Sequence, residues 1–190
     1  MQRGFKTHAE KLSCRLRSEL GLLAHSPLPG KKLIEHLKII LVQPADIPDM
    51  PPELLHEVLN GSSEHWSAIT FYDRSARPVI IHNPKHAPCR QESDLMHETA
   101  HILSKHPPAK IVPLGDFAFR TYDQTQEKEA EWLGACLQIT REGLLWAIRQ
   151  RMNNQEIAQL FGASEALVRF RRNTTGVDVQ LTRYRVWTGR

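Results

Sequence analysis

The residues best able to do chemistry are His97, Glu98 and His101, which form a His-Glu-x-x-His motif. Two histidines four residues apart differ by about 40° around a helix axis, so both imidazoles can reach one metal ion. Glu98 lies about 100° from His97 and can face the open coordination position, where a carboxylate accepts a proton from metal-bound water. The motif predicts a hydrolytic zinc site with His97 and His101 as ligands and Glu98 as the catalytic base.

A catalytic zinc site normally has a third protein ligand, and the acidic start of residues 126–137 offers candidates. Glu127 and Glu131 share one helix face, four residues apart, whereas Glu129 points elsewhere. The acidic cluster also has a plainer explanation, because acidic side chains stabilise the first turn of a helix through its dipole. The spacing alone leaves both Glu127 and Glu131 open as the third ligand.

A helix must position this motif, and the surrounding sequence predicts one over residues 90–105. No Gly or Pro interrupts residues 89–106, and Pro107 and Pro108 end the helix. The apolar contacts of a buried helix come from Leu95, Met96, Ala100, Ile102 and Leu103. The motif therefore lies on a helix that packs into the protein interior.

The remaining elements follow from hydrophobic periodicity and turn residues. We expect a loop over residues 109–123 and an extended tail from residue 173. Strands are expected over 38–42, 66–72 and 79–82, and further helices over 4–20, 31–37, 52–59, 125–138, 141–152, 154–161 and 164–172. Helices before and after one small sheet predict an α+β fold.

Length and composition indicate an ordinary globular protein. The 190 residues suffice for one domain with a small appendage, and 41% are hydrophobic. No apolar run approaches the roughly 18–20 residues that span a bilayer, and no secretory signal is recognisable. The three cysteines lack CxxC spacing, which indicates buried thiols in a reducing compartment. We expect a cytoplasmic protein with no membrane association.

The positive charge is concentrated near the C-terminal end. Residues 141–190 hold 9 Lys and Arg against 4 Asp and Glu, a net charge of +5, and residues 1–140 carry −1. A basic segment of this kind indicates an acidic partner such as nucleic acid, although a solvated basic surface has the same composition.

Residues 155–169 have the spacing of a helix-turn-helix, with Gly162 at the turn and Ser164 as the cap of the second helix. Three basic side chains could contact DNA phosphates: Arg169, Arg171 and Arg172. They lie late in the second helix, whereas base-reading side chains usually lie near its start, where Glu165 would repel phosphate. We therefore favour a packing module that completes the catalytic domain or docks a partner, with direct DNA binding as the alternative.

The sequence is similar to the ImmA/IrrE family of metallopeptidases, of the kind found beside Xre-type helix-turn-helix repressors. The similarity covers nearly the whole chain and is closest in residues 93–103 and 127–137. It extends over residues 3–6, 9–10, 19–22, 66–70, 81–84, 161–164 and 168–173. Two positions depart from the family pattern: Thr140 stands where Pro is usual, and Glu131 where many members carry Asn.

The resemblance implies a zincin-like fold, in which a small sheet packs on the active-site helix, and one zinc ion per chain. It implies Glu127 as the third metal ligand, since the family carries this carboxylate three residues before Ala130. Residues 1–140 would form the metallopeptidase domain and residues 141–190 a helical, helix-turn-helix-like segment. The activity would be that of a gluzincin-like metallo-endopeptidase that cleaves an Xre-type repressor, to control transcription or a stress or toxin–antitoxin-like response.

Three side chains are candidates for stabilising the oxyanion of peptide hydrolysis: Tyr72, His106 and Tyr122. Each also has a structural explanation, which we favour. Zinc is the expected metal because two histidines and a carboxylate suit it, although manganese can occupy a similar site. The alternative function is a non-catalytic DNA- or protein-binding regulator with a structural or relic metal site.

Overall fold

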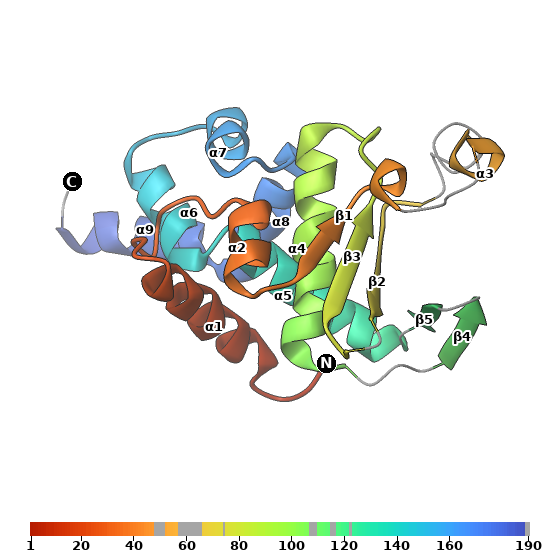
Figure 1. Cartoon of the computed structure of the whole chain (residues 1–190). Coiled ribbons are helices and arrows are strands. Elements are labelled where there is room, and N and C mark those ends of the chain that lie inside the picture. The colour runs from red at the N-terminus through yellow and green to blue at the C-terminus, as the bar shows by residue number, and fades with distance from the viewer. Residues whose placement is uncertain are drawn as a thin grey trace.

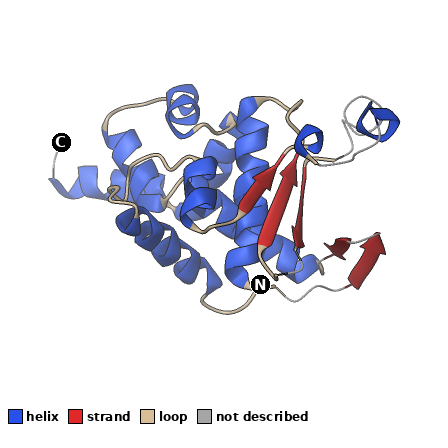
Figure 2. Ribbon diagram, viewed as in Figure 1, coloured by secondary structure: helices blue, strands red, loops and turns tan. Residues whose placement is uncertain are grey.

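The fold is mixed α+β, mostly helical with one small three-stranded sheet (Figures 1 and 2). The computed structural model describes residues 1–47, 52–56, 66–73, 75–106, 110–114, 117–121 and 123–188. Helix α4 (Pro88–Ser104), which carries the His-Glu-x-x-His motif, lies between the sheet and α5 (Gln124–Gln138). The predicted α+β class is confirmed.

The three strands of the sheet lie in the order β1-β3-β2. β1 (Ile40–Val42) runs parallel to β3 (Pro78–His82), and β2 (Ala68–Tyr72) pairs with β3 antiparallel, as the predicted hairpin requires. Their β-branched residues favour extended backbone. Ile80 of β3 is fully buried and packs in one cluster with Leu95 of α4, which holds the motif helix against the sheet.

Helix α5 packs on α4, and α1 (Phe5–Glu19) packs on α5. The core between these three helices consists of apolar side chains at helical spacing. They include Leu12, Leu16, Met96, Ala100, Ala130, Leu133 and Leu137. This core holds α5 at a fixed place beside the motif.

Three short elements complete the N-terminal half: α2 (Gly30–His36), the 3-10 turn η1 (Pro44–Asp46) and α3 (Pro52–His56). The helix predicted over 52–59 is present as α3, and residues 57–59 lie outside the described residues. Among the helices that the structure describes, none combines the length and the apolar character that a bilayer span needs.

The last part of the chain forms a helical bundle with a core of its own. It consists of α6 (Arg141–Arg149), α7 (Asn154–Phe161), α8 (Glu165–Thr175) and α9 (Val177–Thr188). Thr140, Asn153 and Ser164 cap the first three helices, since each side chain accepts a hydrogen bond from a backbone N–H of the first turn. Gly162, with φ at 59°, ends α7 and turns the chain into α8.

Two fully buried arginines bind the end of α5, and one of them, Arg171, joins the bundle to α1. Arg17 of α1 donates a 2.8 Å hydrogen bond to the carbonyl oxygen of Leu137. Arg171 of α8 donates to the carbonyl oxygen of Ile139 at 2.9 Å and pairs with Glu10 of α1. Both guanidinium groups therefore satisfy backbone carbonyls that the end of α5 leaves without helical partners.

A two-stranded sheet occupies part of the segment expected to be a loop over 109–123. β4 (Lys110–Leu114) and β5 (Phe117–Thr121) pair antiparallel, and β5 lies next to β2. The loop prediction was wrong at these strands because it gave Pro113 and the polar residues more weight than the β-branched and aromatic residues. Proline is compatible with a two-stranded hairpin, in which each strand is an edge strand.

The tail expected to be extended from residue 173 is helical instead. Helix α9 begins after Gly176, whose φ is 67°. Val177 is fully buried in the core of the bundle, and Asp178 pairs with Arg172 of α8. Packing against α6 and α8 therefore stabilises a helix that a β-branched, threonine-containing sequence does not favour by itself.

Candidate metal centre

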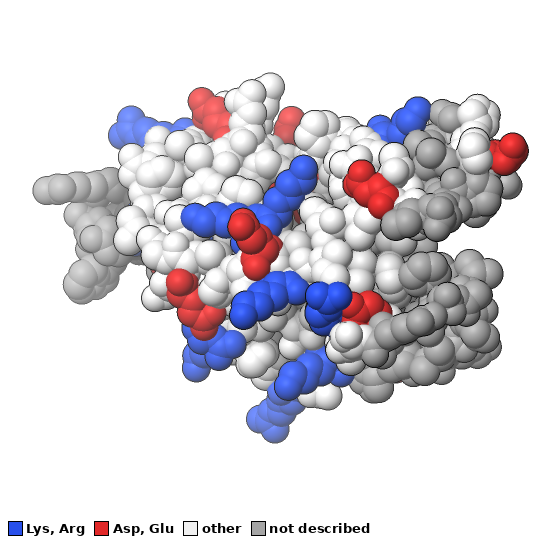
Figure 3. Space-filling view, viewed as in Figure 1, with Lys and Arg blue, Asp and Glu red and all other residues white. Residues whose placement is uncertain are grey.

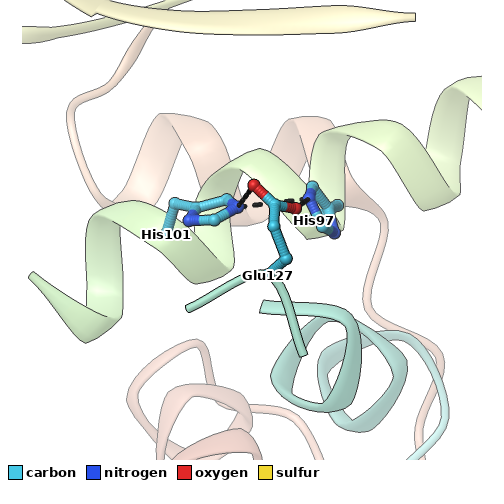
Figure 4. A group of neighbouring side chains, drawn as sticks. All are labelled: His97, His101 and Glu127. Carbon is cyan, nitrogen blue, oxygen red and sulfur yellow. Dashed lines mark hydrogen bonds and ion pairs between the residues drawn. The ribbon is translucent and has the colours of Figure 1, made fainter. Parts of the chain in front are cut away.

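Three of the predicted site residues converge between α4 and α5 (Figure 4). His97 and His101 project from successive turns of α4, and Glu127 projects toward them from the first turn of α5. The Nε2 atom of His97 lies 3.2 Å from Nε2 of His101 and 3.2 Å from Oε2 of Glu127. The Nε2 atom of His101 lies 3.6 Å from Oε1 of Glu127. Two imidazole nitrogens and a carboxylate therefore face one small volume.

These separations fit a tetrahedral metal ion. Zinc bonds of about 2.0–2.1 Å to nitrogen and oxygen place neighbouring ligand atoms roughly 3.3–3.4 Å apart. The two 3.2 Å separations from Nε2 of His97, to Nε2 of His101 and to Oε2 of Glu127, lie close to that value, and the other oxygen of Glu127 is 3.6 Å from Nε2 of His101. Within the described part of the chain the cluster has three donors. Three protein donors leave a fourth position for water or substrate, as catalytic zinc sites do.

Helix capping and close helix packing fix these donors. The carboxylate of Asp123 caps α5, because it accepts hydrogen bonds from two backbone N–H groups of the first turn, at 2.7 and 2.9 Å. This cap sets the position of the turn that carries Glu127. Further along α5, a Cβ on Gly134 would lie 3.2 Å from the backbone nitrogen of His97. Glycine at this position lets α5 approach α4 closely.

Glu98 lies apart from the three donors, on the side of α4 that meets the sheet. Its Oε2 accepts a 2.5 Å hydrogen bond from Oγ1 of Thr70 on β2. Burial, opposed by this hydrogen bond and assisted by the carboxylates of Glu127 and Asp94, raises the pKa of Glu98 to about 7. A carboxyl group with such a pKa can both accept and return a proton near neutral pH.

His101 is the most buried of the donors, with 1% of its side chain exposed, against 30% for His97. Burial and the neighbouring rings of His97 and His106 lower the pKa of His101 to about 3. The ring is therefore neutral, as a metal ligand must be. Its Nδ1 lies 3.1 Å from Nδ1 of His106, whose Nε2 lies 3.3 Å from Oε2 of Glu129. A buried chain of polar side chains thus continues inward from the donors.

The structure places the two candidate ligands of α5, Glu127 and Glu131, and the intervening Glu129 in different surroundings. Glu127 joins the donor cluster, and Glu129 is buried against His106. Glu131 lines a pocket beside His97 and is not among the donors. The geometry therefore favours Glu127 over Glu131 as the third ligand, in agreement with the family resemblance.

A small pocket of about 260 Å³ lies next to the donor cluster. His97, Glu131 and Gly134 line it from α4 and α5, and Leu167 and Phe170 line it from α8. The C-terminal bundle therefore contributes an apolar wall immediately beside the candidate metal centre.

The three side chains considered for stabilising the oxyanion differ in where they lie relative to the site. His106 contacts Nδ1 of His101, whereas Glu127 faces Nε2 on the other side of that ring, so His106 does not face the open position. Tyr72 lies two residues from Thr70 on β2 and shares the strand face that reaches Glu98. Tyr122 lies outside the described residues.

Two contacts of the site do not follow from the sequence patterns. Thr70 is 28 residues before Glu98, and only the tertiary packing of β2 on α4 brings the two together. The contact of Glu129 with His106 is equally non-local. The available signal is His106 itself, which lies five residues after His101 and just beyond the end of α4.

The basic side chains of α8 have partners within the protein. Arg171 is fully buried in its ion pair with α1, Arg172 pairs with Asp178, and the exposed Arg169 lies 3.3 Å from Glu165. On the face drawn in Figure 3, Lys and Arg are interspersed with Asp and Glu. Arg171 is therefore not available to a DNA phosphate in this structure.

The sequence matches the model of one known protein family, described as the IrrE N-terminal-like domain and classed as a peptidase family (Peptidase M78). The match covers residues 57–173, more than half of the chain. It contains the donor cluster and Glu98 and continues through most of α8, whereas α1 lies outside it. No curated protein matches the chain.

Proposed function

Since the chain belongs to the IrrE N-terminal-like family of peptidases, we propose that it is a zinc-dependent endopeptidase that hydrolyses a peptide bond in a protein partner. In this proposal His97, His101 and Glu127 hold one zinc ion per chain, and Glu98 is the catalytic base. The small sheet packed on α4 supports a zincin-like architecture, and the carboxylate ligand supports a gluzincin-like site.

The observation that carries the proposal is the convergence of three donors of the right chemistry. Imidazole nitrogens and a carboxylate are ligands that zinc accepts, and manganese is the second metal that suits them. The 3.2 Å separations from Nε2 of His97 to Nε2 of His101 and to Oε2 of Glu127 are close to those between two ligand atoms of a tetrahedral zinc ion. The exposed fractions of His97 and Glu127, 30% and 42%, leave the cluster open to a substrate.

The described residues suffice for the proton movements of peptide hydrolysis. Zinc, when bound, supplies Lewis acidity that polarises a carbonyl group and acidifies water. Glu98 accepts a proton from the attacking water as its oxygen bonds to the carbonyl carbon. Glu98 then returns that proton to the leaving amine as the C–N bond breaks. Thr70 holds the Glu98 carboxylate in place, because its hydroxyl donates a hydrogen bond to Oε2.

In this proposal the pocket beside His97 binds an apolar side chain of the substrate, next to the scissile bond. We propose that residues 1–140 form the peptidase domain and that residues 141–190 complete it, because Leu167 and Phe170 form one wall of this pocket.

The partner in this proposal is an Xre-type helix-turn-helix repressor in the cytoplasm, whose cleavage would control transcription or a stress response. This partner is what the resemblance of the sequence to metallopeptidases found beside Xre-type repressors implies.

Cleavage assays with matched variants test the proposal. Zinc-loaded wild type and Glu98→Gln are incubated with an Xre-type helix-turn-helix repressor of the same organism, and products are identified by mass spectrometry. We expect Glu98→Gln to keep the metal and lose about 10²–10⁴-fold in rate, and Lys128→Ala, at an exposed position of α5, to cleave at the wild-type rate.

Three other outcomes of this assay would change the account. Full activity of Glu98→Gln would refute its role as base. Cleavage of casein but not of the repressor would reject the partner and keep the peptidase. No cleavage of either, with steeply salt-dependent duplex binding, would favour the non-catalytic regulator.

A further inference from the structure

We propose that His106 and Glu129 are positioning residues that fix the tautomer and orientation of His101, so that its Nε2 lone pair faces the metal. This inference rests on the proposed function, because it concerns how one metal ligand is held. Neither residue belongs to the donor cluster.

A series of contacts connects the donor His101 to His106, and His106 to Glu129. His101 and His106 meet edge to face, with ring centroids 5.2 Å apart and an interplanar angle of 74°. Their Nδ1 atoms are 3.1 Å apart, and Nε2 of His106 lies 3.3 Å from Oε2 of Glu129. The other oxygen of Glu129 accepts a 2.6 Å hydrogen bond from the backbone nitrogen of Gln2. Side-chain exposure is 1% for His101 and 6% for both His106 and Glu129, and the latter two border a pocket of about 670 Å³ that the N-terminal segment also lines.

The hydrogen-bonding roles along this line can be assigned. Between the two Nδ1 atoms, one must donate and the other must accept. If neutral His106 donated from Nδ1, its unprotonated Nε2 would face the carboxylate of Glu129, and two acceptors would repel each other. In this proposal His106 is neutral: Glu129 holds its one proton on Nε2, which leaves Nδ1 of His106 as an acceptor, whereas a doubly protonated His106 would donate from Nδ1 and leave the proton of His101 on Nε2. His101 must then carry its proton on Nδ1, and its Nε2 lone pair points to His97 and Glu127.

Local structure explains how the chain brings these groups together. Lys105 ends α4 with a left-handed φ of 52°, which reverses the chain. The backbone N–H groups of Lys105 and His106 donate to the carbonyl oxygens of Ile102 and His101, the pattern of a Schellman motif. This reversal carries His106 back beside the His101 ring. On α5, residues two apart point to different sides, so Glu127 reaches the metal side of His101 and Glu129 the other.

Zinc affinity of the full-length chain, measured by competition with a chromophoric chelator, tests the inference. We expect His106→Leu to weaken zinc binding by about 10–100-fold, the usual effect of removing a hydrogen-bond partner behind a ligand. Glu129→Gln should weaken it less, by about tenfold. His106→Asn should recover part of the affinity, because its amide oxygen can accept from Nδ1 of His101. The matched control is His82→Leu, which removes a buried imidazole of β3 and should leave affinity unchanged.

Folding of each variant is measured in the metal-free form by circular dichroism, because a merely structural role would lower stability without changing zinc affinity.

Histidine ring ¹⁵N spectra of the zinc-loaded wild type provide a second test that needs no variant. We expect the protons of His101 on Nδ1 and of His106 on Nε2, and protonation of His106 on Nδ1 would overturn the inference. A wild type that binds no zinc would refute the proposed function. A wild type and His106→Leu that bind zinc equally would refute only the role of His106.

Discussion

Gly134 of α5 lies directly against the backbone of His97 in α4: a Cβ on Gly134 would stand 3.2 Å from the nitrogen and 3.3 Å from the Cα of His97. This contact sets the separation of the two helices that carry the metal donors. Glycine inside a helix is about 1 kcal/mol less favourable than alanine. Its presence here is therefore explained by the packing of the site and not by helix propensity.

Gly134→Ala should separate α4 and α5 by a few tenths of an ångström at the donors, because the neighbouring atoms are backbone and cannot rotate away. We expect zinc affinity to fall about tenfold and the free energy of unfolding to fall by about 1 kcal/mol, since overpacking outweighs the gain in propensity. Chelator competition and urea unfolding measure the two effects. Lys128→Ala, at an exposed position of the same helix, is the control. An unchanged zinc affinity in Gly134→Ala would refute this account of the helix crossing.

Arg171→Ala should destabilise the protein strongly, because it leaves Glu10 without its cation and the carbonyl oxygen of Ile139 without its donor. Loss of one partner of a buried ion pair costs about 3 kcal/mol. Arg169→Ala, at a residue whose side chain is 57% exposed, should change stability by less than about 0.5 kcal/mol. Urea unfolding of the two variants makes the comparison. Equal effects would show that Arg171 does not join α8 to α1.

Glu98→Gln should make the metal-free protein more stable above neutral pH. Burial raises the pKa of Glu98 from its ordinary 4.5 to about 7, so the folded state holds this proton more tightly than the unfolded chain. The resulting stability is complete below pH 4.5 and is lost as pH rises through about 7. Because Glu98 is only half-buried, we expect a difference of roughly 2 kcal/mol between wild type and variant at pH 8, and none at pH 4. Equal unfolding free energies at pH 8 would contradict this explanation.

Cys136 should be inert to alkylation in the folded protein. It is fully buried, and burial raises the pKa of its thiol to about 12, so almost no thiolate forms at pH 8. Cys14 and Cys89 are partly exposed and should react first with iodoacetamide. Mass spectrometry of the native protein and of urea-unfolded protein gives the order of labelling. Modification of Cys136 as fast as Cys89 in the native state would contradict its burial.

The elements around the motif could be predicted because local sequence determines them. The predicted helices over 90–105 and 125–138 correspond to α4 (Pro88–Ser104) and α5 (Gln124–Gln138). Their apolar periodicity, the proline at the start of α4 and the capping Asp123 are all local signals. Among the site residues, the i, i+4 histidines follow from helix geometry alone.

The parts that could not be predicted depend on non-local packing. Helix α9 is stabilised by burial of Val177 against the bundle, which no local propensity reveals. Thr70 meets Glu98, and Glu129 meets His106, only after distant segments have packed together. Spacing within α5 left Glu127 and Glu131 open, because it does not fix the angle at which α5 crosses α4, and only the family resemblance pointed to Glu127.

Metal content tests the central claim most directly. Wild type, His97→Ala, Glu127→Ala and Glu131→Ala are offered zinc, dialysed, and analysed for zinc per chain. The account predicts about one zinc per chain in wild type and Glu131→Ala, and far less in His97→Ala and Glu127→Ala. A wild type that binds no zinc, or a folded Glu127→Ala that keeps a full equivalent, would contradict the proposed metal centre.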